Sequence, residues 1–233
     1  MEPSAFLELV QLIVDGDAGK VSRRLRATPS LATMALPVGA TRQTATDFFY
    51  TEICHYMYGG DTALHMAAAG FSRPMAKLLV SNGADCRAKN RRGAEPLHYA
   101  SDANRSAPRA QADVIEYLIS IGADSDALDK SGVAPLHRAV RTRSLAAVRA
   151  LLDGGAKPRQ PNRSGSTPLH LAVQTTGRGG SGSDQARRQQ TAVIQLLLER
   201  GAKRTDKDAR GKSVEQAATS VWIRTLLKDW KAG

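Results

Sequence analysis

Hydrophobic positions recur at helical spacing in short stretches that end at glycine. Residues 5–27 predict a helix pair, because their apolar residues fall on one face of each helix. These residues are Phe6, Leu9, Val10 and Ile13, then Val21 and Leu25. Four later apolar runs, at 78–79, 118–119, 151–152 and 196–198, are each followed by a Gly-Ala pair. Glycine there is typical of a helix end. The chain therefore predicts many short helices and no long one.

A six-residue motif precedes each of the four later runs. Its copies are Thr-Ala-Leu-His-Met-Ala, Glu-Pro-Leu-His-Tyr-Ala, Ala-Pro-Leu-His-Arg-Ala and Thr-Pro-Leu-His-Leu-Ala, at 62–67, 95–100, 134–139 and 167–172. The histidines of the first two copies are 33 residues apart, as are those of the last two, whereas 39 residues separate His98 from His137. A fixed period with a repeated motif indicates a repeat architecture.

This motif and its period resemble the T-P-L-H-x-A signature of ankyrin repeats. The resemblance implies an all-α helical solenoid with short β-turn fingers, of about six repeats including atypical terminal caps. It also implies that the motif residues are structural, with each histidine hydrogen-bonded within and between repeats. These residues are Thr62, His65, Pro96, His98, Pro135, His137, Thr167, Pro168 and His170.

The register of the motif predicts seven segments. They are an N-terminal capping repeat at 1–35, an aromatic-rich inserted finger at 36–58, repeats at 59–93, 94–132, 133–165 and 166–211, and a C-terminal capping repeat at 212–233. Two repeats carry insertions in the turn between their helices, at about 101–112 and 175–189. These insertions are either tolerated surface loops or a bipartite basic contact. Their arginines are Arg105, Arg109, Arg178, Arg187 and Arg188.

The amino-acid composition limits where the protein can act and which kinds of partner it can bind. The chain has 42% hydrophobic and 24% charged residues, which is typical of a folded protein, and a net charge of +11. Such a charge favours an acidic protein, nucleic acid or anionic lipid as partner, although it also serves solubility. The two cysteines match no disulfide framework or zinc spacing, and we find no signal peptide or membrane span. We expect a cytoplasmic monomer without metal or cofactor.

The resemblance also implies where a partner docks, namely on fingers and inner helices. The variable contact positions of ankyrin repeats fall on seven basic residues, Arg91, Arg92, Lys130, Arg141, Arg163, Arg210 and Lys212, and on the acidic Asp102. Other inner-helix positions in this set are Ala69, Gly70, Ala103, Thr142, Gln174 and Thr175. A row of basic side chains would attract an acidic partner surface. The alternative is that these charges are merely solvated.

The insertion at 36–58 is a second candidate surface. Five of the eleven aromatic residues lie within eleven positions of it, at 48–50, 56 and 58. Exposed aromatic clusters anchor protein partners, which makes Phe49, Tyr50 and Tyr58 candidate contacts. The alternative is that the segment folds back over the first repeat and buries Phe48 and Ile53, at about 1.5–3 kcal/mol each.

Enzyme chemistry has little support in the chain. The glycine-rich stretch at 177–182 matches G-x-G-x-x-G, but a helix precedes it where a dinucleotide site needs a strand, so we interpret it as a loop. The histidines of the motif leave no catalytic triad, and Glu52, Cys54 and His55 form only a weak third hypothesis. We predict a non-catalytic protein-binding module, with nucleic-acid phosphate binding through the same basic residues as the alternative.

Overall fold

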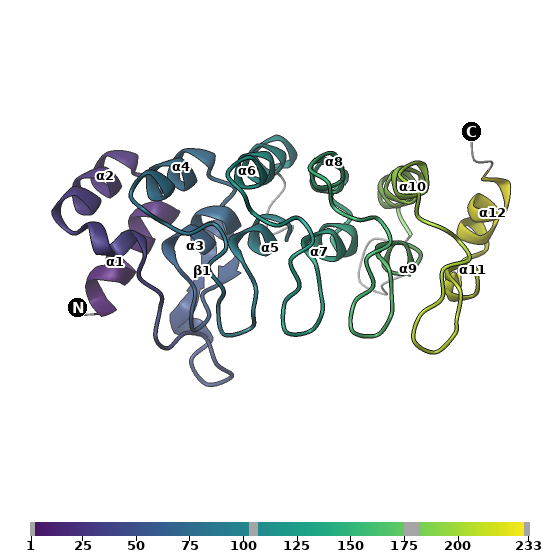
Figure 1. Ribbon diagram of the computed structural model, residues 1–233, viewed down its shortest axis with the longest axis horizontal. Helices are drawn as coiled ribbons and strands as arrows, with labels where there is room; N and C mark the ends of the chain where they lie inside the picture. Colours follow the sequence, from purple (N-terminus) through teal and green to yellow (C-terminus); the bar gives the residue numbers. More distant parts are fainter. Residues whose placement is uncertain (1–2, 103–106, 175–181, 231–233) are drawn as a thin grey trace. The chain divides into compact units, whose positions relative to one another are not determined.

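The computed structural model describes residues 3–102, 107–174 and 182–230. The chain divides into two compact units, Met1–Asp124 (unit 1) and Ser125–Gly233 (unit 2), and we describe each by itself. In each unit the helices form two rows, an inner row from which the fingers extend and an outer row behind it (Figure 1).

Unit 1 contains three helix pairs. Its inner helices are α1 (Pro3–Val14), α3 (Ala63–Ala69) and α5 (Pro96–Ala100), and its outer helices are α2 (Ala18–Ala27), α4 (Arg73–Ser81) and α6 (Pro108–Ser120). Helix α3 packs between α1 and α5, while α4 packs against α2 and α6. A short 3-10 helix, η1 (Pro29–Ala32), follows the first pair.

Unit 2 repeats this arrangement. Its inner helices are α7 (Pro135–Arg141), α9 (Pro168–Ala172) and α11 (Val214–Ala217), and its outer helices are α8 (Leu145–Asp153), α10 (Asp184–Glu199) and α12 (Val221–Asp229). Helix α9 contacts both α7 and α11, and α10 contacts α8. The prediction of a helical repeat fold is therefore confirmed. Each predicted repeat range contains one helix pair, and the exact boundaries stay a prediction.

Local sequence explains why the helices begin and end where they do. Proline occupies the first helical position of α5, α7 and α9, where its missing N–H costs no hydrogen bond. Each of α4, α6, α8 and α10 is followed by a glycine at a positive φ of 91–100°, a backbone conformation that other residues rarely adopt. Ala67 and Ala100 are fully buried, and their small side chains let inner helices approach closely.

The two insertions are partly helical, so the prediction that they extend only the turn is wrong. Residues 108–112 belong to α6 and residues 184–189 belong to α10, which run for 13 and 16 residues where α4 and α8 run for nine. Pro108 is the first residue of α6, and Ser183 caps the start of α10 through its side chain, which accepts the Ala186 N–H. Arg105 and Arg178 lie outside the described residues, as do Ala103, Thr175 and most of the glycine-rich stretch.

The insertion at 36–58 forms a small hairpin. It comprises η2 (Thr46–Phe48), β1 (Phe49–Tyr50), η3 (Thr51–Ile53) and β2 (His55–Tyr56). The strands are antiparallel, with Phe49 opposite Tyr56. Backbone hydrogen bonds from Ala40 to Met57 and from Leu36 to Asp61 close its base, at 2.8 and 2.7 Å. The segment is therefore an ordered part of unit 1.

Within the described residues, every helix is too short or too polar to cross a membrane.

Candidate protein-binding surface

The four motif histidines hold the repeats in register. In each, Nδ1 accepts the backbone N–H of the residue before the helix, at 3.1 Å. The ring is therefore the neutral tautomer with hydrogen on Nε2. Nε2 donates to the backbone carbonyl of the next finger, from His65 to Ala94, from His137 to Ser166 and from His170 to Lys212, at 3.1–3.2 Å. Burial lowers the pKa of His137, which keeps its ring neutral. These rings lie one per repeat, and the partners of His65, His137 and His170 are three different carbonyls.

Each finger is pinned by one acceptor side chain. In unit 2 the Asp129 carboxylate accepts the N–H groups of Ser131 and Val133, at 2.8 and 3.0 Å. Asn162 and Asp208 make the same pair of contacts in the next two fingers. Burial raises the pKa of Asp129, but these N–H groups and Arg138 together lower it by more. The pKa is therefore below its ordinary value, and the carboxylate stays ionised. The fingertips are therefore set in place before any partner arrives.

The three fingers of unit 2, residues 129–133, 162–166 and 208–212, touch through their backbones. The Ala209 N–H donates to the Ser164 carbonyl at 3.0 Å. At Gly132, with φ +69°, a Cβ atom would lie 2.7 Å from the Arg163 nitrogen, so only glycine permits this approach. Lys130, Arg163, Arg210 and Lys212 lie on these fingers and are exposed, and in the part of unit 2 that the structure describes none forms an ion pair.

The net positive charge of the chain lies in unit 2. Its sequence holds 20 Lys and Arg against nine Asp and Glu, whereas unit 1 holds 13 of each. The net charge of +11 thus belongs to residues 125–233, which also contain only two aromatic residues, Trp222 and Trp230. Sequence reasoning treated the charge as a property of the whole chain and missed this division, although counting by halves would have found it.

Some other basic residues in unit 2 form ion pairs. Arg138 pairs with Asp129 at 3.2 Å, and Arg159 pairs with Asp206 at 2.6 Å through both carboxylate oxygens. Arg141 ends α7 and is exposed. The neighbouring Thr142 is half-buried, and its hydroxyl donates to backbone carbonyls of α7.

In unit 1 the hairpin covers the inner helices. Ile53 is 2% exposed and packs against Gly70, where a Cβ atom would lie 3.0 Å from its Cγ2. The His55 ring stacks on Tyr99 of α5 with 4.5 Å between centroids, and His55 lies 3.8 Å from Asp102. The prediction that Ala69 and Gly70 face a partner is therefore wrong, since Ala69 is fully buried and the hairpin lies over Gly70.

The outer side of the hairpin presents aromatic rings. Phe49 and Tyr56 are each 39% exposed, with ring centroids 4.7 Å apart. Tyr50 and Tyr58 are half-buried, and the guanidinium of Arg92 lies 3.9 Å from the centre of the Tyr58 ring. Arg91, on the same finger, is exposed and donates its N–H to Gly59. The segment therefore buries Ile53 and half-buries Phe48, while Phe49 and Tyr56 are exposed. A role of the exposed rings in binding stays a prediction.

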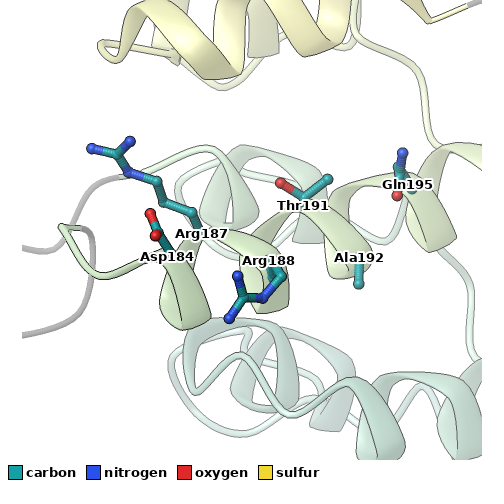
Figure 2. A pocket seen from close by; sticks show the side chains of 6 residues that line it. All are labelled: Asp184, Arg187, Arg188, Thr191, Ala192 and Gln195. Carbon is teal, nitrogen blue, oxygen red and sulfur yellow. The ribbon is translucent and has the colours of Figure 1, made fainter.

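A shallow depression of about 310 Å³ lies on α10. Figure 2 shows that the side chains of its two arginines, Arg187 and Arg188, point in different directions from α10. The bipartite basic contact of the two insertions stays a prediction, because Arg105 and Arg178 lie outside the described residues.

The described residues contain no cluster of three or more His, Cys, Asp or Glu side chains that could hold a metal ion. Cys54 is exposed and its thiol lies 3.3 Å from the Thr51 carbonyl, while His55 is turned toward Tyr99 and Asp102. Cys54 and His55 therefore contact different groups.

Comparison with known families agrees with the architecture. A model of three ankyrin repeats matches residues 106–210, and a model of a single ankyrin repeat matches residues 59–91. The chain belongs to the ankyrin repeat family. Ankyrin repeats are generally protein–protein interaction modules and typically not enzymes. No curated protein matches the chain.

Proposed function

We propose that this ankyrin repeat protein is a non-catalytic binding module whose unit 2 holds an acidic segment of a partner protein along its fingertips. The single observation that carries the proposal is the row of exposed cations Lys130, Arg163 and Arg210 on three touching fingers, in the unit that has the whole net charge. Opposite charge on a partner would speed encounter and fix its orientation. Lys212, on the third finger, and Arg141, the last residue of α7, are the other predicted contacts in this unit.

Nucleic acid is the competing partner for these cations. A protein that binds single strands without sequence preference combines cations with aromatic rings on which bases stack. The fingers of unit 2 contain no aromatic residue, and the two tryptophans of this unit lie in α12 and just after it. Acidic protein is therefore the better match.

The test compares a fluorescent Glu-rich peptide with a single-stranded RNA and a DNA duplex of similar length, at about 150 and about 500 mM salt. We expect the peptide to bind unit 2. The triple variant Lys130→Glu, Arg163→Glu, Arg210→Glu should lose about 3- to 150-fold in affinity, at roughly 0.2–1 kcal/mol for each of the three exposed charge pairs.

A matched variant with the same charge change elsewhere, Arg149→Glu, Arg187→Glu, Arg188→Glu, separates the fingers from net charge. These arginines are exposed on the outer helices α8 and α10. The proposal is wrong if both variants lose affinity equally. It is also wrong if both nucleic acids bind more tightly than the peptide and if nuclease treatment releases the proteins that this chain captures from lysate.

In unit 1 we propose that Phe49 and Tyr56 form a second contact, with Tyr58 and Arg92 beside them. Support comes from their exposure, which is unusual for large apolar side chains in this chain. Tyr50, half-buried, is the weaker candidate.

A further inference from the structure

The three fingers of unit 2 follow one another at a fixed step. A Cβ atom on Gly132 would lie 2.7 Å from the backbone nitrogen of Arg163, so the first two fingers are in contact there. Lys130 is two residues from Gly132, and two residues span at most about 7 Å. The backbones of Lys130 and Arg163 are therefore at most about 11 Å apart, and neighbouring helices pack about 8–10 Å apart. The step from one finger to the next is thus about 10 Å.

The step from the second finger to the third is similar. The Ala209 N–H donates to the Ser164 carbonyl at 3.0 Å, and these two residues are next to Arg210 and Arg163 in the chain. Arg163 and Arg210 are therefore also separated by roughly 10 Å. All three fingers extend from the same side of unit 2, so one segment of a partner can cross them in sequence (Figure 1).

The exposed cations are distributed along these steps. Lys130 lies on the first finger, Arg163 on the second, and Arg210 and Lys212 on the third, and all four are exposed. The aspartate side chains of the first and third fingers accept backbone N–H groups of their own fingers. Each finger therefore presents at least one cation to solvent.

The surface of the fingertips favours an extended partner over a helix. A partner helix docks by its apolar face in an apolar groove. Among the described large hydrophobic side chains of unit 2, however, only Leu128 and Val221 are exposed, and Val221 lies in α12. An extended segment has N–H and C=O groups that need partners. Ser131 and Ser164, exposed at the fingertips, can hydrogen-bond to such groups.

We propose that the acidic segment lies extended across the three fingers and places one carboxylate on each, so that its acidic residues recur at every third position. An extended chain advances about 3.3 Å per residue, so three residues match one step of about 10 Å. The second cation of the third finger, Lys212, favours a further acidic residue at that end of the segment. This inference rests on the proposed function, which requires an acidic segment but leaves its spacing open.

The test titrates three peptides of equal length, each with three Glu, into the full chain labelled with ¹⁵N at about 50 mM salt, where screening is weaker. The first peptide has Glu at every third position and the second has three adjacent Glu, both in a background of Gly and Ser. The third has Glu seven positions apart in a background of Ala and Gln, so that a helix would present them about 10.5 Å apart. We expect the first peptide to bind about 3- to 10-fold more tightly than the others and to shift amide signals of all three fingers.

Charge exchange tests whether each finger holds one carboxylate. Replacement of the middle Glu of the first peptide by Lys should weaken its binding to the native chain by about 3-fold or more, and Arg163→Glu should restore it. Lys130→Glu and Arg210→Glu are the matched controls, because each makes the same charge change on a neighbouring finger. Neither control should restore binding.

Three results would overturn the inference. They are equal binding of the peptides with spaced and adjacent Glu, tighter binding of the helical peptide, and equal restoration by all three variants. In each case acidic peptide still binds the fingertips, so the proposed function stands. If none of the three peptides shifts the signals of the fingers, the proposed function fails, and this inference fails with it.

Discussion

The hydroxyl of Tyr99 lies 2.8 Å from both carboxylate oxygens of Asp61, and neither residue is more than 2% exposed. Asp61 also accepts the Asn90 side-chain amide at 2.8 Å and the Tyr58 N–H at 2.6 Å. This buried carboxylate thus joins the end of the hairpin, the finger at 90–94 and helix α5. A buried charge with several donors specifies one arrangement of these segments.

Tyr99→Phe should therefore destabilise the protein without loss of packing volume. The substitution removes a donor from a buried carboxylate, and hydrogen bonds to charged groups contribute about 1.5–3 kcal/mol. Urea denaturation followed by circular dichroism measures the effect. Tyr56→Phe is the control, because its exposed ring should change the free energy of unfolding by less than about 0.5 kcal/mol. Equal stability of Tyr99→Phe and the native chain would contradict the role given to Asp61.

Gln111 and Gln190 should each stabilise the repeat in which they lie, the two repeats that carry insertions. The Gln111 side-chain amide donates to the carbonyls of Ala100 and Asp102, and that of Gln190 donates to Ala172 and Gln174. Both side chains are at most 2% exposed and satisfy the ends of α5 and α9. Replacement by Ala should cost about 1–3 kcal/mol, since a buried carbonyl is left without a donor. In denaturant melts, Gln189→Ala, one position away on the exposed face of α10, should be neutral.

These glutamines also show what the sequence could reveal. Once the insertions are removed from the numbering, Gln111 and Gln190 fall at the position of Ser72 and Ser144, which cap α4 and α8. The change from Ser to Gln in the two longer repeats was therefore visible in the aligned motif. It marks a longer outer helix in place of a capped short one. The motif, its period and the terminal glycines were sufficient for the helix pairs.

The course of the hairpin was not predictable in this way. It depends on contacts between residues far apart in sequence, such as Ile53 with Gly70 and His55 with Tyr99, which no local pattern encodes. For the same reason the sequence could not show that the inner face of unit 1 is covered.

Because of Glu95, the free energy of unfolding should fall as the pH rises from about 4 to 7. It occupies the motif position held elsewhere by Thr or Ala, it is 1% exposed, and its carboxylate oxygens have no hydrogen-bond partner among the described residues. Lys89 approaches one oxygen only to 3.8 Å. Burial raises the pKa of Glu95, with Lys89 and Arg87 lowering it by less.

The folded state therefore binds the Glu95 proton more tightly than the unfolded state does. The contribution of Glu95 to the free energy of unfolding is fully present below the ordinary pKa of glutamate. It is lost as the pH rises through the higher pKa that Glu95 has in the folded state. Glu95→Gln should be more stable than the native chain at pH 7, and the difference should shrink toward pH 4. Melting temperatures of both proteins across this range measure the difference. A difference in melting temperature that stays constant with pH would show that the Glu95 carboxylate is not its cause. Asp129→Asn is the comparison of opposite sign, because the pKa of Asp129 is lowered.

The two sides of the hairpin should separate stability from binding. Ile53→Ala leaves a cavity over Gly70 and should cost about 2–5 kcal/mol. Phe49→Ala with Tyr56→Ala removes rings that are 39% exposed, with 4.7 Å between their centroids, so it should cost about 1–2 kcal/mol and less than Ile53→Ala. Thermal melts give the order of stability, and affinity capture from lysate of the source cells gives the binding. We expect the ring variant to melt near the native temperature and to lose any partner that contacts unit 1. If the ring variant unfolds early and retains every partner, the rings serve as a cover and not as a contact.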